Sequence, residues 1–426
     1  MELAPARGTQ DLVPPAGGHM RALYDRAGDL ARRYGYRYVE TPVFEATELF
    51  ARTSGETSDV VAKEMYTFTD RSDRSLTLRP EGTAPVMRAF LHDRQRLGSP
   101  FKAYYLTRMY RYSRPQAGRY REHRQFGVEV FGTDAPGADV EVIALGDAFL
   151  RSLGLRRYRL ELNSIGDDVC RPAYRAALLA YLDEHKDELR DEHRERFAAN
   201  PLRVLDCKDD ACRAVAAGAP LMVEHLCDAC DAHFDAVVAG VRAQGLEPVI
   251  TPTLVRGLDY YTRTAFEFVS EAMQEGGNAQ QATVFGGGRY DGLAEALGGP
   301  HVPGVGFGMG LERVLLALAD EDVSPPSEPP LAAYVVAIGN AARDAARVLV
   351  AELRTAGIGA DFPYEDRPLK AQLKMADRAD AAVAVIIGER ELAAGTVTVR
   401  RMDDGSQTAV ALADVASRLR TEERSA

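Results

Sequence analysis

Six arginines are concentrated between Tyr104 and Gly132, in a stretch that reads YYLTRMYRYSRPQAGRYREHRQFGVEVFG. They are Arg108, Arg111, Arg114, Arg119, Arg121 and Arg124. Guanidinium groups bind phosphates through several hydrogen bonds at once. The whole chain carries a formal net charge of -11, so this local positive charge predicts a site for a polyphosphate or a nucleic acid. The alternative for this stretch alone is a solvated, arginine-rich β-ribbon.

A second run, GVGFGMGLER from Gly304 to Arg313, has glycine at every second position and then changes to a helical pattern. Glycines on one face of a strand leave room for a flat group against the backbone. The helix that follows offers its positive N-terminus to an anion. Leu311 takes the place of the third glycine of the dinucleotide fingerprint, so the run is not that motif. A tight strand-to-helix corner in a core is the alternative.

Two further runs combine tyrosine with arginine. LVRGLDYYTRTAFEF carries Arg256, Tyr260 and Tyr261, and FGGGRYDGL carries Arg289 and Tyr290. Phenol and guanidinium groups can bind a polar ligand, but they also pack together at the edges of cores. Either run taken alone leaves both interpretations open.

The elements that must position these residues alternate between strand and helix patterns. We expect helices at about 18–34, 84–92 and 137–153, and a hairpin with a long loop centred on RPQAGR. Strand patterning stops for a charged, helix-forming insertion at about 170–246 and then resumes, which favours one antiparallel sheet interrupted in sequence. The linker EDVSPPSEPP, residues 321–330, separates a first domain, 1–325, from a small α/β domain, 331–426. The fold class is therefore predicted as α+β.

Composition narrows the class of protein. The 426 residues are 46% hydrophobic and 27% charged, as in ordinary globular proteins. The N-terminus shows no signal-peptide pattern and no run reaches transmembrane length, which predicts a cytoplasmic protein without a membrane partner. Five cysteines in so long a chain do not form a disulfide framework.

Four of the cysteines have a spacing of their own. Cys207-x4-Cys212 and Cys227-x2-Cys230 approximate the arrangement of a four-cysteine structural zinc site. Small buried apolar side chains or free thiols are the alternative.

Taken together, the runs resemble the histidyl-tRNA synthetase family along nearly the whole chain. The region around Pro42 is similar to the class II dimerisation motif, the Arg111 ribbon to the second class II motif, and Gly306–Arg313 to the third. LVRGLDYYTRTAFEF and GGGRYDGL are similar to signatures specific for histidine, and LRPEGT also matches. The resemblance implies a homodimer with a class II catalytic core on an antiparallel sheet, a helical insertion and an anticodon-binding domain.

The resemblance also implies the reaction. The carboxylate of L-histidine attacks the α-phosphorus of ATP, pyrophosphate leaves, and histidine then passes to the 3′ end of tRNA(His). Arg111 and Arg256 match the catalytic arginines at the α-phosphate and the substrate carboxylate. The ATP-binding positions are Arg111, Arg119, Gly308, Gly310 and Arg313, with Mg²⁺ expected on the β- and γ-phosphates.

Further positions match the histidine and tRNA sites of the family. The histidine-binding positions are Glu81, Gly82, Thr83, Arg111, Gln125, Glu129, Arg256, Tyr260 and Tyr261. Among them, Glu129 and Tyr261 match residues that hydrogen-bond the imidazole ring. Arg114 and Gln116 match positions that meet the acceptor end of tRNA.

Two other functions compete with this one. A catalytically silent relative, the regulatory subunit of ATP phosphoribosyltransferase, shares the class II core, but it typically has degraded signatures and lacks the last domain. A different class II ligase, such as the prolyl or threonyl enzyme, is opposed by the LVRGLDYY and GGGRYDG runs.

The role implied for Arg256 is testable. Arg256→Ala should slow histidine-dependent exchange of pyrophosphate into ATP by about 100-fold or more, because it removes a charged donor from the developing negative charge. Circular dichroism should show an unchanged fold. Arg108→Ala, in the ribbon but without an implied role, is the control. A normal exchange rate in the Arg256 variant would remove the assigned role.

Overall fold

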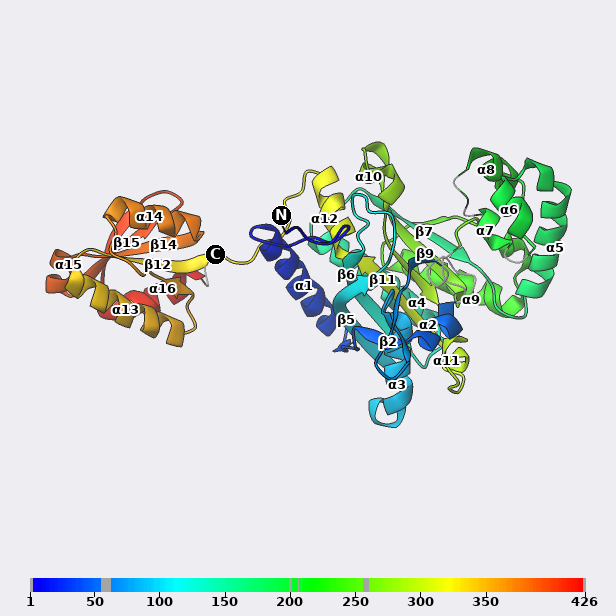
Figure 1. Ribbon diagram of the computed structural model, residues 1–426, viewed down its shortest axis with the longest axis horizontal. Helices are drawn as coiled ribbons and strands as arrows, with labels where there is room; N and C mark the ends of the chain where they lie inside the picture. Colours follow the sequence, from blue (N-terminus) through cyan, green and yellow to red (C-terminus); the bar gives the residue numbers. More distant parts are fainter. Residues whose placement is uncertain are drawn as a thin grey trace. The chain divides into compact units, whose positions relative to one another are not determined.

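The chain divides into two compact units, Met1–Ser327 and Glu328–Ala426 (Figure 1). The structure is a computed structural model that describes residues 3–54, 63–198, 201–205, 207, 209–255 and 260–423. Each unit is described by itself below.

The first unit is built on an eight-stranded sheet with the order β1-β5-β6-β11-β10-β9-β7-β8. Its strands are β1 (Arg37–Tyr38), β5 (Phe101–Tyr110), β6 (Glu122–Phe131), β7 (Tyr158–Ser164), β8 (Pro248–Ile250), β9 (Thr262–Ser270), β10 (Thr283–Arg289) and β11 (Gly304–Gly310). The pairs at the two edges, β1 with β5 and β7 with β8, are parallel, and all the others are antiparallel. Strand β7 pairs with β9 although the insertion separates them in sequence. The predicted sheet, interrupted in sequence, is confirmed.

Helices cover both faces of this sheet. The helices of the first unit are α1 (Ala16–Arg33), α2 (Thr47–Ser54), α3 (Thr83–Leu97), α4 (Pro136–Ser152), α5 (Arg171–Glu184), α6 (Asp191–Arg196), α7 (Leu202–Leu205), α8 (Asp210–Ala217), α9 (Asp228–Ala243), α10 (Glu271–Glu275), α11 (Leu293–Ala296) and α12 (Leu311–Asp320). Within the described ranges, no helix combines the length and the apolar character needed to cross a membrane.

The strand period of two sorts the side chains of β6 between two cores. Phe126 and Val128 point toward α1 and α4, where they pack with Leu23 and Phe149. Phe131 points to the opposite face and packs with Phe90 of α3. The site described below lies on this second face.

Helix α3 extends five residues beyond the predicted end at 92. Its apolar periodicity is interrupted at Asp93, whose backbone is not helical (φ -113°, ψ 16°), and the three polar residues that follow Asp93 are exposed. The sequence pattern therefore followed the helix only as far as this interruption.

The insertion has a core of its own, formed by α5, α7, α8 and the start of α9 around Tyr174, Leu178 and Val215. Helix α9 differs from the others in the insertion. Its later residues Phe234, Val237 and Val241 belong to the core beneath the main sheet.

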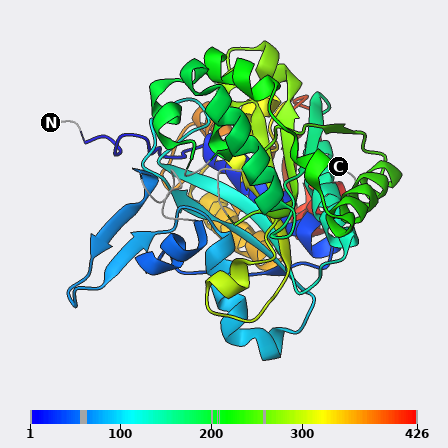
Figure 2. The ribbon, with the colours of Figure 1, turned by 90° about the vertical axis from the view of Figure 1, so that its right-hand side faces the viewer.

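A small second sheet joins β2 (Phe44–Ala46), β4 (Ser75–Leu78) and β3 (Tyr66–Thr69) in the order β2-β4-β3. The β3–β4 hairpin projects from the first unit (Figure 2).

The second unit is a five-stranded sheet with the order β13-β12-β14-β15-β16. Its elements are β12 (Leu331–Ala337), α13 (Asn340–Thr355), β13 (Ala360–Asp361), α14 (Leu369–Arg378), β14 (Ala381–Ile387), α15 (Glu389–Ala394), β15 (Thr396–Arg401), β16 (Gln407–Ala411) and α16 (Val415–Glu423). Strand β12 is parallel to β13 and β14, while β15 and β16 are antiparallel. Leu349 of α13 packs with Val335 on one face, and Ala376 of α14 packs with Val336 on the other. This is the expected α/β domain.

Candidate active site

A strip of glycines crosses one face of the main sheet. In the register of β6 and β11, Gly306 lies opposite Glu129, Gly308 opposite Gly127, and Gly310 opposite Gln125. Residues opposite one another in antiparallel strands share a face. The backbone of this face is therefore bare of β-carbons over several successive positions.

Polar side chains lie flat on this strip. A β-carbon added at Gly306 would be 2.1 Å from Glu129 Oε2, and one added at Gly308 would be 2.6 Å from Gln125 Nε2. The ring of Tyr105 lies between Gly82 and Gly127, because an added β-carbon would meet it at 2.5 Å and 2.1 Å, respectively. The sequence predicted that a flat group lies against the glycines. In the structure, side chains of the protein itself take this place.

Glu129 is the centre of a buried hydrogen-bond cluster. It has no exposed surface, and its Oε1 accepts hydrogen bonds from Thr83 Oγ1 at 2.8 Å and from Tyr105 Oη at 3.2 Å. Its Oε2 accepts one from the Tyr290 hydroxyl. Burial raises the pKa of Glu129 to about 8, against the opposing effect of these hydrogen bonds.

Glu81 forms a second buried carboxylate beside the first. It accepts the backbone N–H groups of Thr83 at 2.6 Å and Ala84 at 3.0 Å, at the N-terminus of α3. Burial raises the pKa of Glu81, while these amides and then Arg111 lower it. A helix N-terminus favours a carboxylate, which explains why Glu81 is tolerated in the interior.

Tyr260 and Tyr261 complete the wall around these carboxylates. Their ring centres are 4.8 Å apart, and the Tyr260 ring contacts the Tyr290 ring at 5.6 Å. Both are buried. The pKa of Tyr260 is raised well above its ordinary value by burial, and also by Tyr261, Glu81 and Glu129 nearby. A cavity of about 640 Å³ opens beside this wall and is lined by Tyr260, Thr262 and Asp291, among others.

Two of the predicted ATP-binding arginines lie near a neutral histidine. Arg111 Nε donates to the Pro80 carbonyl at 2.7 Å, and Arg313 Nη1 donates to the Thr283 carbonyl at 2.8 Å. His123 lies near both, and burial, then Arg111 and then Arg313, lower its pKa to about 3. His123 therefore adds no charge at neutral pH, and the positive charge here is that of the arginines.

The loop of the arginine ribbon is exposed. Arg119 forms an ion pair with Glu64 at 2.7 Å, and the two backbone hydrogen bonds between Gln116 and Arg119 close the turn. Arg114 and Gln116 are exposed at this tip. Arg313 Nε donates to the Gly118 carbonyl at 3.4 Å, which ties the loop to α12.

The structure thus brings most of the predicted histidine-binding residues into one cluster: Glu81, Gly82, Thr83, Gln125, Glu129, Tyr260 and Tyr261. Arg256 falls outside the described residues. Gly308 is covered by Gln125, whereas the nearest neighbour of a β-carbon at Gly310 would be Arg313 Cγ, at 4.0 Å.

Tyr105 and Tyr290 were missing from the predicted site residues. Tyr105 pairs with Gly127 in the hairpin, so it lies on the same sheet face as Gln125 and Glu129. The alternation of the two strands could have identified it from the sequence. Tyr290 follows Arg289, which is fully buried between Asp139 and Asp291 and so fixes the end of β10.

The cysteine set predicted from spacing needs correction. Cys227 and Cys230 lie with Cys170 and Asp167, while Cys207 and Cys212 lie with His193. Cys170 precedes α5, and the fold brings this helix start beside the start of α9. Spacing along the chain could not reveal this meeting.

The glycine strip yields a prediction. Gly306→Ala should weaken binding of L-histidine, the ligand implied by the resemblance, by at least about tenfold, because overpacking costs ~1–3 kcal/mol. The added methyl would also meet the Val128 carbonyl at 2.3 Å, which cannot swing away as a side chain can. Gly310→Ala is the matched control and should bind histidine normally in calorimetry. Equal affinities in the two variants would contradict the packing argument.

The buried Glu129 yields a second prediction. Its folded-state pKa of about 8 lies above its ordinary value of 4.5, so its contribution to stability is complete below about pH 4.5 and is lost as the pH rises through about 8. Between about pH 4.5 and pH 8, the free energy of unfolding of the wild type should therefore fall by more than ~1 kcal/mol relative to that of Glu129→Gln. Urea unfolding at several pH values measures it. Glu184→Gln removes an exposed carboxyl group and serves as the control for the change in net charge. If the difference in unfolding free energy between the wild type and Glu129→Gln did not depend on pH, the raised pKa would be contradicted.

Comparison with known proteins agrees with this geometry. Residues 8–314 match the family model of histidyl-tRNA synthetase, and residues 332–422 match that of an anticodon binding domain. The histidine–tRNA ligase of Moorella thermoacetica is 52% identical over 410 residues, 96% of each chain. That of Desulforudis audaxviator is 48% identical over 428 residues and 100% of each chain. The crystal structure of apo S. aureus histidyl-tRNA synthetase superimposes with a TM-score of 0.81 at 35% identity, covering 98% of this chain and 100% of that one. The chain therefore belongs to the histidyl-tRNA synthetase family.

Proposed function

We propose that this chain is a histidine–tRNA ligase. It activates L-histidine with ATP to give histidyl-adenylate and pyrophosphate, and then transfers histidine to the 3′ end of tRNA(His). The observation that carries the proposal is the buried Glu129 cluster, which lies on the same sheet face as the glycine strip and close to the arginine ribbon.

Glu129 and its tyrosines suit an imidazole ring. A neutral imidazole has one N–H donor and one acceptor nitrogen, and the cluster offers both a carboxyl group and phenol groups. In this proposal Glu129 and Tyr261 hydrogen-bond the ring, with Tyr260 beside them. A side chain without ring nitrogens would leave the buried groups unpaired, which gives strong discrimination without an editing step.

The α-amino group of the amino acid is assigned to Glu81, Thr83 and Gln125, and Gly82 lies between the first two. Glu81 is already held as an acceptor by the amides of Thr83 and Ala84. A carboxylate fixed in this way can bind an ammonium group without reorganising.

Activation needs positioning and charge neutralisation and no covalent enzyme intermediate. Arg111 and Arg256 are assigned to the α-phosphate and the histidine carboxylate, and Arg119, Arg313, Gly308 and Gly310 to ATP. Arg119 is 45% exposed in its pair with Glu64, so its guanidinium group is open to solvent and to a phosphate. Mg²⁺ bound to the β- and γ-phosphates would neutralise further charge.

The tRNA is assigned to two places. Arg114 and Gln116, exposed at the tip of the ribbon, meet the acceptor end, and the second unit binds the anticodon. We accordingly divide the chain into a catalytic core, 1–325, a linker, 321–330, and an anticodon-binding domain, 331–426. We place this enzyme of protein synthesis in the cytoplasm.

We also infer that the enzyme is a homodimer. Pro42 lies in the region that resembles the class II dimerisation motif. Large apolar side chains are exposed close to it, with Val43 at 43%, Phe44 at 49% and Phe68 at 43%. The Phe44 and Phe68 rings contact each other on the small sheet, so they form one patch that a second copy can cover.

The alternative, a regulatory subunit of ATP phosphoribosyltransferase, has less support. The relatives named histidine–tRNA ligase match over the whole chain, including the last domain. The described residues also include the signature arginines Arg111 and Arg313.

Amino-acid-dependent exchange of pyrophosphate into ATP tests the proposal. L-histidine should support rapid exchange, and each of the other amino acids should support less than about one thousandth of that rate. Folding of the same preparation is checked by circular dichroism. Folded protein that shows no exchange with histidine would overturn the enzyme assignment and favour the regulatory subunit.

A further inference from the structure

Asp167, Cys170, Cys227 and Cys230 form a compact cluster outside the site described above. One potential ligand atom from each residue lies within 4.8 Å of all the others. Cys170 Sγ is 3.3 Å from Asp167 Oδ1. All five cysteines fall within the described ranges, and all are free thiols.

Two helix N-termini meet at this cluster. Cys170 immediately precedes α5, Cys227 immediately precedes α9, and Cys230 is in the first turn of α9. The Cys227 backbone N–H donates to Cys170 Sγ at 3.2 Å, and the Val169 N–H donates to Asp167 Oδ1 at 3.0 Å. Helix N-termini and amide donors favour negative charge beside them, and zinc binds cysteine as the thiolate.

Apolar packing does not explain the arrangement. Cys170 and Cys230 are buried, at 3% and 0% exposure, and their burial alone is also expected of small apolar core residues. The carboxylate of Asp167, however, is directed at their sulfur atoms. Three sulfurs and one carboxylate oxygen around a common centre are instead a donor set of zinc sites.

We propose that Asp167, Cys170, Cys227 and Cys230 bind one Zn²⁺ ion. In a tetrahedral zinc site with bonds of about 2.3 Å, neighbouring sulfurs are about 3.8 Å apart, so the cluster needs only a small contraction. The sulfur-rich set selects zinc over Mg²⁺ or Ca²⁺, which take oxygen ligands. With all four ligands supplied by the protein, the site is closed, and its role is structural.

Neighbouring cations balance the charge of this site. Three thiolates and a carboxylate exceed the charge of Zn²⁺ by two. Arg263 Nη2 binds Asp167 Oδ2 at 3.3 Å, and Arg171 follows Cys170 directly. These two guanidinium groups are opposite in sign to the excess negative charge and equal to it in number.

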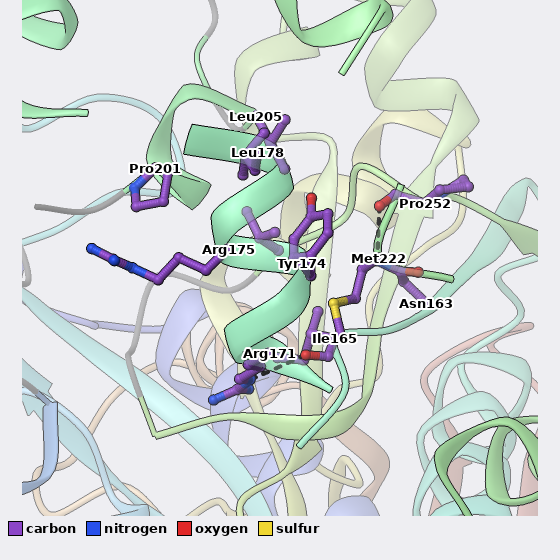
Figure 3. A pocket seen from close by; sticks show the side chains of 11 residues that line it. Asn163, Ile165, Arg171, Tyr174, Arg175, Leu178, Pro201, Leu205, Met222 and Pro252 are labelled. Carbon is purple, nitrogen blue, oxygen red and sulfur yellow. Dashed lines mark hydrogen bonds between the residues drawn. The ribbon is translucent and has the colours of Figure 1, made fainter. Parts of the chain in front are cut away.

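The ion would also brace part of the histidine site, an inference that rests on the proposed function. Arg171 donates to the Ile165 carbonyl at 3.1 Å (Figure 3). It also donates to the Tyr261 carbonyl. The Arg263 N–H donates to the Gly166 carbonyl at 2.7 Å. The loop that carries Asp167 is therefore bonded to the start of β9, next to Tyr260 and Tyr261. In Figure 3 the same helix start borders a cavity of about 130 Å³ lined by Tyr174, Leu178 and Met222, among others.

The second cysteine cluster provides a matched control. Among the residues that the structure describes, His193, Cys207 and Cys212 supply three ligands, one fewer than a closed structural zinc site needs. Cys207 and Cys227 are both partly exposed, so replacement by serine should change the free energy of unfolding by a similar amount at either position.

Elemental analysis of the full chain, purified without a metal-binding tag and dialysed against a weak chelator, tests the proposal. We expect about one zinc per chain in the wild type and in Cys207→Ser, and far less than one in Cys227→Ser. Replacement by Co²⁺ should give the intense visible bands of tetrahedral thiolate coordination, and Cys227→Ser should lack them. Wild-type protein with far less than one zinc after reduction and zinc addition would overturn the proposal. So would a Cys227→Ser variant that keeps its zinc.

A measurement on the wild-type protein tests the proposal even if Cys227→Ser does not fold. Alkylation with and without a strong chelator, followed by mass spectrometry, should show Cys170, Cys227 and Cys230 protected only while zinc is bound. Protection confined to Cys207 and Cys212 would overturn the proposal.

Zinc removal should also raise the KM for histidine in pyrophosphate exchange more than it lowers kcat. A zinc-loaded protein inactive in exchange would count against the proposed function and leave the zinc site standing.

Discussion

The absence of β-carbons along the centre of the main sheet is the constraint on which the rest of the site depends. Gly127 lets the Tyr105 ring lie against the backbone, and Gly306 leaves room for the carboxylate of Glu129. With these side chains held flat, the Tyr105 hydroxyl reaches the carboxyl group of Glu129. Any side chain at these positions would lift the cluster, and the hydroxyl groups that now donate to Glu129 would lose their acceptor.

Buried charge is managed in two different ways in the catalytic unit. Arg289 is fully buried against Asp139 and Asp291, and Arg124 against Glu312 at 3.1 Å, so each of these charges has an opposite charge as partner. Glu129 has no cation as partner among the described residues; it accepts hydrogen bonds from the hydroxyl groups of Thr83, Tyr105 and Tyr290, and burial raises its pKa to about 8 although these bonds oppose the rise. The paired charges fix α4 and α12 to the sheet. The carboxyl held by hydroxyl groups keeps hydrogen-bonding capacity for a ligand, as expected where a pKa is perturbed at a functional site.

Much of this arrangement could be predicted from the sequence, since alternation and helical periodicity report which side chains are buried. They indicated the ribbon, the interruption between β7 and β9, and the α/β unit. Burial of individual polar groups was not predictable. Arg124 looks like Arg108 in the sequence, yet the first is buried against Glu312, whereas the second forms an exposed pair with Glu122 at 3.4 Å. The meeting of Cys170 with Cys227 depends on tertiary contacts 57 residues apart, which no local pattern encodes.

Helix α9 has a consequence for how this protein can have changed over time. Its first turn, with Cys230, belongs to the core of the insertion, whereas Phe234, Val237 and Val241 belong to the core under the main sheet. The insertion is therefore not a cassette that could be gained, lost or exchanged at both of its sequence boundaries. A shorter ancestor or an engineered miniature would have to retain most of α9 and reconnect it to β7. Lineage-specific variation is accordingly expected in α5–α8, with α9 retained.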